Sequence, residues 1–174
     1  MTRRYGRAPR GERVVDAVPE NWGENVTTIG ALGLDGVRAA MSFEGALDGD
    51  VFEVFVKQVL VPTLREGDVV LLDNLNVHKN TEARKAILVA KATVEFLPPY
   101  SPDLNPIEQL WSKLKAKVRG AKARTLEALE TALSAAYTAV TADDAEGWFV
   151  HCGLWLRPKK GAASAPIEPN AAPI

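Results

Sequence analysis

Apolar and polar positions follow the periods of strands and helices along most of the chain. Alternating residues at 26–34 and 37–43 predict two strands that turn at Asp35-Gly36. An unbroken apolar run at 69–72 and a short run at 93–97 predict two further strands. A helical period predicts helices over the other segments, which are 48–64, 80–90, 105–118, 125–140 and 142–152. The chain is therefore predicted to mix strands and helices in one α/β domain.

Composition agrees with a single globular domain that ends before the carboxyl terminus. The 174 residues are 47% hydrophobic and 25% charged, which is enough for one sizeable core. No internal repeat and no linker between two domains is visible. Residues 156–174 are rich in Pro, Ala and Gly and lack an apolar period, so they predict a disordered tail after a domain at 1–155.

The one cysteine and the absence of long apolar segments bear on where the protein works. Cys152 has no second cysteine to pair with, so an internal disulfide is excluded and a reducing compartment is favoured. The charged amino terminus has no apolar signal region, and no stretch approaches the length of a membrane span. We expect a cytoplasmic protein with no membrane partner.

The first candidate for chemistry is Asp73, which follows the apolar run at 69–72. Ligand crevices of open α/β sheets lie at the carboxyl ends of strands, so an aspartate at this position is a candidate site residue. Asp73 and Asn74 are also frequent residue types in ordinary turns, and a turn alone would explain them. The position therefore becomes informative only together with a second acid.

The second candidate is Glu108, near the start of the predicted helix at 105–118. Asn105 is a favoured helix cap, Pro106 suits the first helical position, and Glu108 falls where a carboxylate can complete a capping box. A structural capping role and a catalytic role explain Glu108 equally well. If both acids are functional, two carboxylates from different elements can share divalent cations such as Mg²⁺, as displacement at phosphorus requires.

Basic residues gather in two short segments although the net charge of the whole chain is only −1. The amino-terminal group includes Arg3, Arg4 and Arg7, and the second group includes Lys113, Lys115, Lys117 and Arg119. At 100° per residue, Lys115 and Arg119 fall within about 20° of Glu108 on the helix surface. Such stripes suit DNA phosphates, although a solvated helix face is their more common role.

Two blocks, 73-DNLNVH-78 and 98-PPYSPDLNPIEQLW-111, resemble the second and third acidic blocks of DDE transposases from bacterial insertion sequences of the IS-six-thirty type. These are relatives of the mariner elements. The interval of 34 residues between Asp73 and Glu108 is the one by which the family is known. A looser likeness extends from Met1 to about Trp155, through 4-RYGRAPRGER-13 and 26-VTTIGALGLDG-36.

The resemblance lacks one part of the family pattern. The first catalytic aspartate of the family ends the first strand of an RNase H-like sheet, upstream of the block that matches 4–13. Asp16 matches no catalytic residue of the family. The resemblance therefore implies an RNase H-like mixed sheet flanked by helices but without its first central strand, as in the carboxyl-terminal part of a transposase. Overlapping reading frames and truncated copies both produce such chains.

The resemblance also implies a function and a set of site residues. Asp73 and Glu108 would be the retained catalytic and metal-binding acids, with Mg²⁺ or Mn²⁺ as cofactor and DNA, both element ends and target, as substrate. His78 would orient Asp73, contact the scissile strand or cap the next helix. An upstream-frame product or a second copy would be the protein partner.

The alternatives belong to other functional classes. A catalytically inactive DNA-binding or interaction remnant is favoured by the absent aspartate. A nuclease of the same fold, such as a Holliday-junction resolvase, shares the carboxylates but not the block SPDLNPIEQLW. We expect the parent enzyme to cleave and join DNA, and the short chain alone to be inactive.

Overall fold

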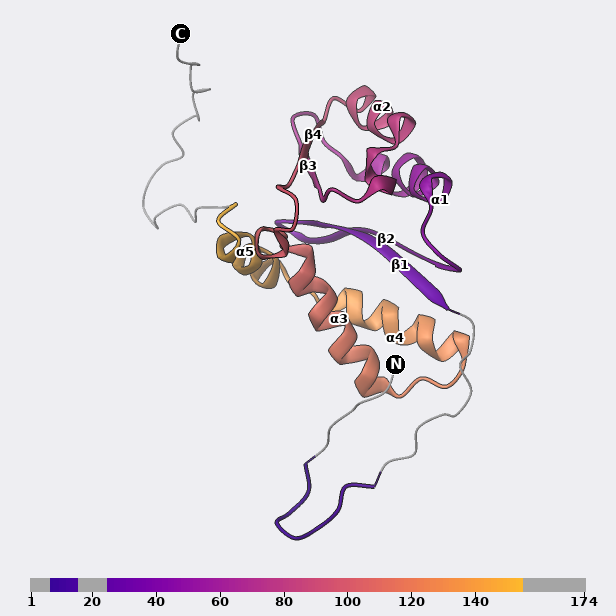
Figure 1. The fold of residues 1–174 in the computed structure, drawn as a ribbon, viewed down its shortest axis with the longest axis vertical. Coiled ribbons are helices and arrows are strands. Elements are labelled where there is room, and N and C mark those ends of the chain that lie inside the picture. The colour runs from indigo at the N-terminus through magenta and orange to yellow at the C-terminus, as the bar shows by residue number, and fades with distance from the viewer. Residues whose placement is uncertain (1–6, 16–24, 155–174) are drawn as a thin grey trace.

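A computed structural model describes residues 7–15 and 25–154 of the chain (Figure 1). Arg3, Arg4, Asp16 and the tail predicted at 156–174 lie outside the described residues. Within the described ranges, no helix has both the length and the apolar character needed to cross a membrane.

Four strands form two separate pairs in the described part of the chain. β1 (Val26–Gly33) and β2 (Gly36–Glu44) make an antiparallel hairpin, in which Gly36 takes a φ of 117° at the end of the turn. β3 (Val69–Leu72) and β4 (Thr93–Phe96) are parallel, with Val69 opposite Thr93 and Leu72 opposite Phe96. The strands predicted from the sequence are therefore all present, within two residues of the expected bounds.

The predicted helix at 48–64 changes its hydrogen-bonding pattern along its length. It begins as α1 (Gly49–Val54), capped by Asp48, whose side chain accepts from the Val51 amide at 2.9 Å. It continues as the π-helix η1 (Phe55–Leu60) and ends as the 3₁₀ turn η2 (Val61–Thr63). Pro62 lies in that last turn, where the helix can no longer continue.

The remaining helices match the apolar periods read from the sequence. They are α2 (Thr81–Val89), α3 (Ile107–Ala121), α4 (Leu126–Thr138) and α5 (Ala142–His151). Two 3₁₀ turns that the sequence did not predict are η3 (Asn76–Lys79) and η4 (Pro102–Leu104). Along the chain, η3 follows Asp73 and η4 precedes Glu108, so each turn adjoins one of the two predicted acids.

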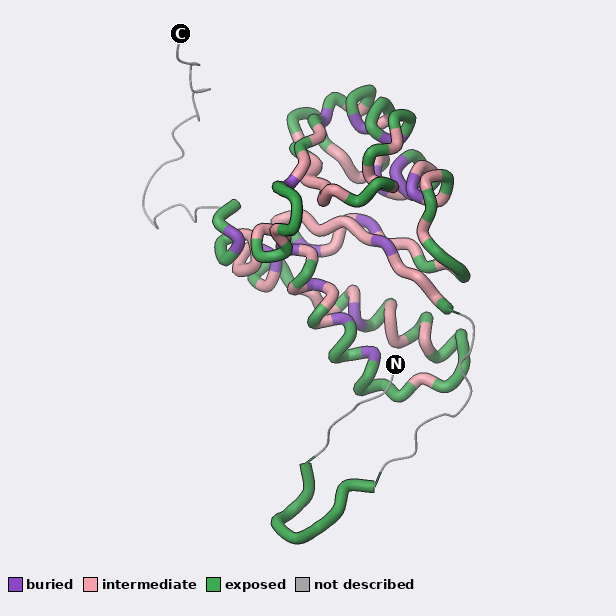
Figure 2. Tube along the Cα trace, in the orientation of Figure 1, coloured by how far each residue is buried: buried purple, intermediate pink, exposed green. Residues whose placement is uncertain are grey.

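The β1–β2 hairpin lies between two layers, as Figure 1 shows. On one side, Ile29 and Ala39 join a core formed with α1, η1 and α2, in which Phe52, Phe55 and Val56 are buried. On the other side, Leu32 and Val37 pack against a second core from α3 and α4, centred on Leu110, Leu114, Val118 and Ala136. Figure 2 shows the buried positions on both sides of the hairpin. One hairpin thus holds the two layers together.

The sheet is divided, although its α/β character is as predicted. Among the described residues, β1 pairs only with β2 and β3 pairs only with β4. Side chains join the two pairs: Arg38 of β2 donates to Asp68, next to β3, at 2.8 Å and to Asp35 at 2.9 Å. In the described part of the chain, the Arg38–Asp68 contact therefore joins the two pairs, and no strand lies between them.

Candidate functional site

Asp73 follows the carboxyl end of β3, as the sequence predicted, and its carboxylate is held by two contacts. Oδ1 accepts a hydrogen bond from the Leu75 amide at 3.0 Å and lies 2.6 Å from Nδ1 of His78. The Asp73 side chain is 38% exposed, and that of His78 only 15%. Both contacts use the same oxygen, so Oδ1 is engaged by the protein while Oδ2 is left for another ligand.

The position of His78 favours one of its three predicted roles. Its ring packs against Phe52, with ring centroids 4.8 Å apart, and its Nδ1 faces Asp73. The cap of α2 is supplied instead by Asn80, whose side chain accepts from the Ala83 amide at 2.9 Å. His78 therefore does not cap the next helix, and in this structure it orients the Asp73 carboxylate.

The end of β3 is tied to the segment that leads toward Glu108. The Asn74 side chain donates to the Leu97 carbonyl, and the Leu97 amide donates to the Leu72 carbonyl at 2.8 Å. Beyond Leu97 the chain proceeds through η4, where the Asn105 amide donates to the Pro102 carbonyl at 3.1 Å. The backbone of Glu108 then bonds to the Asn105 carbonyl at 3.1 Å. Hydrogen bonds thus tie the end of β3 to Leu97, and a second series of turns leads from Ser101 to Glu108.

Glu108 is not part of a capping box, so this prediction was wrong. Asn105 ends η4 instead, and α3 begins after Pro106 without a side-chain cap. The Asn105 amide, which in a capping box would donate to the Glu108 carboxylate, donates instead to the Pro102 carbonyl. The Glu108 side chain is exposed and has no hydrogen bond or ion pair within the described part of the chain. Its carboxylate is therefore free to bind a ligand.

The donor set fits a hard divalent cation only in part. Asp73 and Glu108 offer carboxylate oxygens, the ligands that Mg²⁺ and Mn²⁺ prefer. Within the described ranges, however, no group of three His, Cys, Asp or Glu side chains is placed to hold a metal ion. Two carboxylates can hold one cation whose other ligands are water or groups from elsewhere. A complete site needs further ligands.

The predicted basic face of α3 divides into an engaged residue and three accessible ones. Lys113 forms an ion pair with Asp144 of α5, and its ammonium lies 5.9 Å from the Trp148 ring. The hydrogen bond from Lys113 lowers the pKa of Asp144 to about 2. Lys115, Lys117 and Arg119 are exposed and have no ion pair with the described residues. Lys113 thus holds α5 on α3, while the other three side chains face solvent, as does Arg7.

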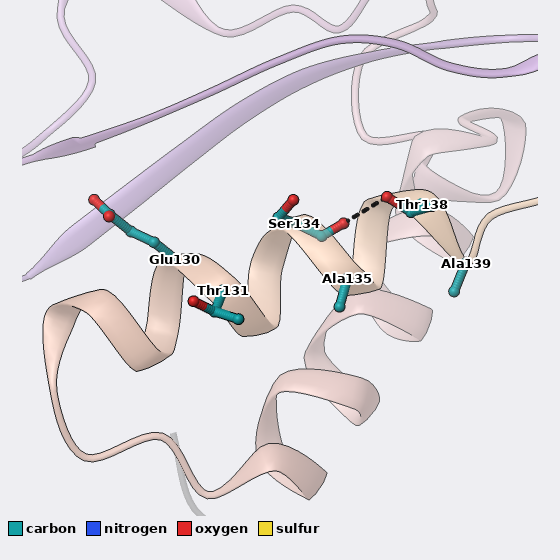
Figure 3. Close-up of a pocket in the computed structure, with 6 residues that line it drawn as sticks. All are labelled: Glu130, Thr131, Ser134, Ala135, Thr138 and Ala139. Carbon is teal, nitrogen blue, oxygen red and sulfur yellow. Dashed lines mark hydrogen bonds between the residues drawn. The ribbon is translucent and has the colours of Figure 1, made fainter.

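A shallow hollow on the outer face of α4 offers no comparable chemistry (Figure 3). Its lining residues are Glu130, Thr131, Ser134, Ala135, Thr138 and Ala139. Thr138 donates to the Ser134 carbonyl at 3.0 Å, a contact internal to the helix. Only Glu130 among these residues is ionisable near neutral pH, so the hollow is not the candidate site.

Comparison with known proteins identifies a family from the sequence and a similar fold among solved structures. A family model described as DDE superfamily endonuclease matches residues 1–130. No curated protein sequence matches the chain. Among solved structures, the Mos1 strand transfer complex is similar with a TM-score of 0.63 at 15% identity, over 88% of this chain and 46% of that chain.

Two other Mos1 structures are similar to the same extent. They are the Mos1 transposase paired-end complex with left transposon end, with a TM-score of 0.66 at 15% identity, and the Mos1 mariner paired end complex with Mn, with 0.60 at 16%. Each covers 88% of this chain and 47% of the Mos1 chain. The likeness confirms the predicted RNase H-like fold class, and the chain spans less than half the length of these transposase chains.

Proposed function

The chain belongs to the DDE superfamily endonucleases, and we propose that it provides two of the metal-binding acids of a transposase that cleaves and joins DNA. The observation that carries this proposal is the connection from Asp73 to Glu108. Asn74 ties the end of β3 to the segment that ends in Glu108, whose carboxylate has no partner among the described residues. We propose that this connection brings the two acids, which lie on different elements, to one region.

Asp73 and Glu108 would hold Mg²⁺ or Mn²⁺, and the similar Mos1 structure with Mn is consistent with this choice. A cation bound there would stabilise charge on the phosphate and lower the pKa of the attacking hydroxyl. The protein's own part is positioning. Leu75 and His78 hold Oδ1 of Asp73, so Oδ2 is the oxygen presented to the cation. His78 acts through Asp73 and is not assigned as a general base.

The third acid of the site would come from outside the described residues. Two carboxylates leave the arrangement for phosphoryl displacement incomplete, because a pair of cations normally needs a further acid. We propose that another segment or another chain supplies it, either an upstream-frame product or a second copy. The source would be an insertion sequence of the IS-six-thirty type, on the strength of the blocks at 73–78 and 98–111. A catalytically inactive remnant is the alternative that the incomplete donor set favours.

DNA phosphates would lie along the exposed side of α3. Lys115 and Arg119 share the side of the helix that carries Glu108, while Leu110, Leu114 and Val118 face the core. Lys117 and Arg7 add exposed positive charge, and Arg3 and Arg4 lie outside the described residues. Lys113 is the exception, because its charge is already paired with Asp144.

The proposal is tested by Mn²⁺ binding and by cleavage. We expect the chain to bind Mn²⁺ in calorimetry, with at least tenfold weaker binding after Asp73→Asn or Glu108→Gln, because each removes one anionic ligand. The matched control is Glu130→Gln, which changes an exposed acid on α4 and should leave Mn²⁺ affinity unchanged.

Cleavage separates the active parent from the inactive remnant. With Mg²⁺ or Mn²⁺, the chain alone should not cut element-end DNA detectably, since a lost ligand costs on the order of a thousandfold in rate. A longer polypeptide that supplies the third acid should cut, and Asp73→Asn or Glu108→Gln should abolish its activity. An inactive longer polypeptide would favour the remnant, and metal-dependent cutting by the chain alone would show that its acids already suffice.

A further inference from the structure

Tyr100 is the most exposed large apolar side chain among the described residues. Its relative exposure is 103%, so the ring contacts nothing in the described fold. Its backbone φ is 57°, in the left-handed region that side chains other than Gly and Asn rarely adopt. A tyrosine here exposes an aromatic ring and strains the backbone, with no compensating contact in the described structure.

The segment around Tyr100 is rigid. Pro98, Pro99 and Pro102 fix three backbone angles within five residues. Ser101 donates from its hydroxyl to the Pro99 carbonyl at 3.3 Å, and the Leu104 amide donates to the Ser101 carbonyl at 3.2 Å. Figure 2 draws most of this connection between β4 and α3 as exposed. The ring is therefore held in solvent by a stiff support and is not at the end of a free loop.

The same segment joins the two proposed acids along the chain. Tyr100 is three residues after Leu97, so their Cα atoms are at most about 11 Å apart. Leu97 is bonded to Asn74, the neighbour of Asp73. On the other side, hydrogen-bonded turns lead from Ser101 to Glu108. The ring is thus fixed between the two acids along the chain.

We propose that Tyr100 stacks on an unpaired base at the DNA end that this site processes. Every base offers a face for aromatic stacking, and single-stranded nucleic acid is bound by exposed aromatic rings combined with positive charge. The positive charge is present on α3 at Lys115 and Arg119. The proposal deepens the proposed function and rests on it, because it names the form of the DNA as an end with unpaired nucleotides.

The test compares two DNA duplexes in buffer that contains EDTA. One duplex is blunt, and the other has a three-nucleotide overhang with 2-aminopurine, whose fluorescence is quenched by stacking. We expect the chain to quench the 2-aminopurine and to bind the overhang about tenfold more tightly than the blunt end. Tyr100→Ala should abolish both effects, whereas Tyr100→Phe should keep both because it retains the ring.

The control variant is Val89→Ala, which removes another exposed apolar side chain, at the end of α2. It should leave the preference for the overhang unchanged. Equal binding of both duplexes by the unaltered chain, or a preserved preference in Tyr100→Ala, would overturn the proposal. If Tyr100→Phe loses the preference for the overhang, the contact depends on the hydroxyl group. That result would also overturn the stacking proposal.

The test is independent of the metal site. EDTA removes divalent cations, so the result does not depend on Asp73 or Glu108 holding one. A chain that binds neither duplex overturns the stacking proposal, while Mn²⁺ calorimetry reports separately on the two acids. Failure of Mn²⁺ binding with an intact overhang preference would overturn the proposed metal site and retain the role of Tyr100.

Discussion

The two ends of the candidate site are built differently. At the end of β3, Asp73 is fixed by the Leu75 amide and by His78, which itself packs against Phe52. At the start of α3, the Glu108 side chain has no hydrogen bond or ion pair with the described residues. The first acid is oriented before any ligand arrives, and the second is oriented only through its backbone.

This difference suggests different roles in cation binding for Asp73 and Glu108. A carboxylate held through one oxygen presents the other oxygen in a fixed direction, as supporting contacts do in metal sites. A carboxylate on an exposed helix start can change its rotamer at little cost. We infer that Asp73 would set the position of a bound cation and that Glu108 would adjust its rotamer to reach it. The same difference gives three expected outcomes.

The largest expected effect comes from removing the support of Asp73. His78→Ala should weaken Mn²⁺ binding by about ten- to a hundredfold, because outer contacts that orient a ligand typically contribute this much to metal affinity. Calorimetry with Mn²⁺ measures it. The matched control is His151→Ala, which changes an exposed histidine at the end of α5 and should leave Mn²⁺ affinity unchanged. Equal affinities in the two variants would show that Asp73 needs no support.

The second effect concerns the free energy of unfolding. Asp73→Ala should lower it by about 1–2 kcal/mol, because the Leu75 amide and the largely buried His78 side chain both lose their acceptor. Glu108→Gln should change it by about 0.5 kcal/mol or less, which is the size of a helix-dipole contribution. Urea unfolding followed by circular dichroism compares the two variants. A larger loss for Glu108→Gln would contradict the free carboxylate described here.

The smallest expected effect concerns the ion pair between Lys113 and Asp144, which holds α5 against α3, the helix that carries Glu108. The hydrogen bond from Lys113 depresses the pKa of Asp144 in the folded protein to about 2, from an ordinary value of 3.8. The pair therefore stabilises the fold above about pH 3.8, and this contribution disappears as the pH falls toward 2. Its size should be about 1 kcal/mol or less, because both side chains are more than a quarter exposed.

Lys113→Met isolates that contribution. The variant should be less stable than the parent chain at pH 6, and most of this difference should be lost near pH 2, as measured by thermal unfolding. Lys115→Met is the matched control, since Lys115 is exposed on the same helix and has no such pair with the described residues. A stability difference that persists at pH 2 would assign the role of Lys113 to its contact with Trp148 instead.

The long periodic elements could be predicted from the sequence because the two cores impose their period on it. The inner face of α3 repeats every three or four residues at Leu110, Leu114 and Val118, which are all buried. The short strands are less fully covered: β3 has an exposed Val69, and β4 alternates exposed Thr93 and Glu95 with partly buried Val94 and Phe96. The start of α2 also follows from local residues, since Asn80 is a favoured cap and its side chain accepts from the Ala83 amide three residues later.

Features that depend on competition between neighbouring elements could not be predicted. The signature of a capping box at 105–108 is complete in sequence, but the turn η4 reaches Asn105 first and uses its backbone. The change from α-helix to π-helix at Phe55 leaves no trace in the apolar pattern. Local signals are therefore reliable only when no adjacent turn uses the same residues.

Contacts between residues that are distant in sequence could not be predicted either. The sequence places Lys113 in a basic stripe. Only the fold shows that its ammonium forms an ion pair with Asp144, 31 residues away. His78 could be named as a candidate to orient Asp73, but two other roles were equally open until the ring was seen against Phe52. Tyr100 gave no signal at all, since exposure of one ring in a proline-rich segment follows from the backbone conformation.

The divided sheet has a consequence for how the molecule opens. In the described part of the chain, no strand hydrogen bonds run from the β1–β2 pair to the β3–β4 pair, and Arg38 joins them through side chains. Proteins open locally in cooperative units that often coincide with supersecondary motifs such as a strand pair. The amides of β3 and β4 should therefore exchange with solvent in their own cooperative unit, separate from the hairpin. A strand that paired with both would merge the two units into one and would make the orientation of Asp73 depend on the stability of the whole domain.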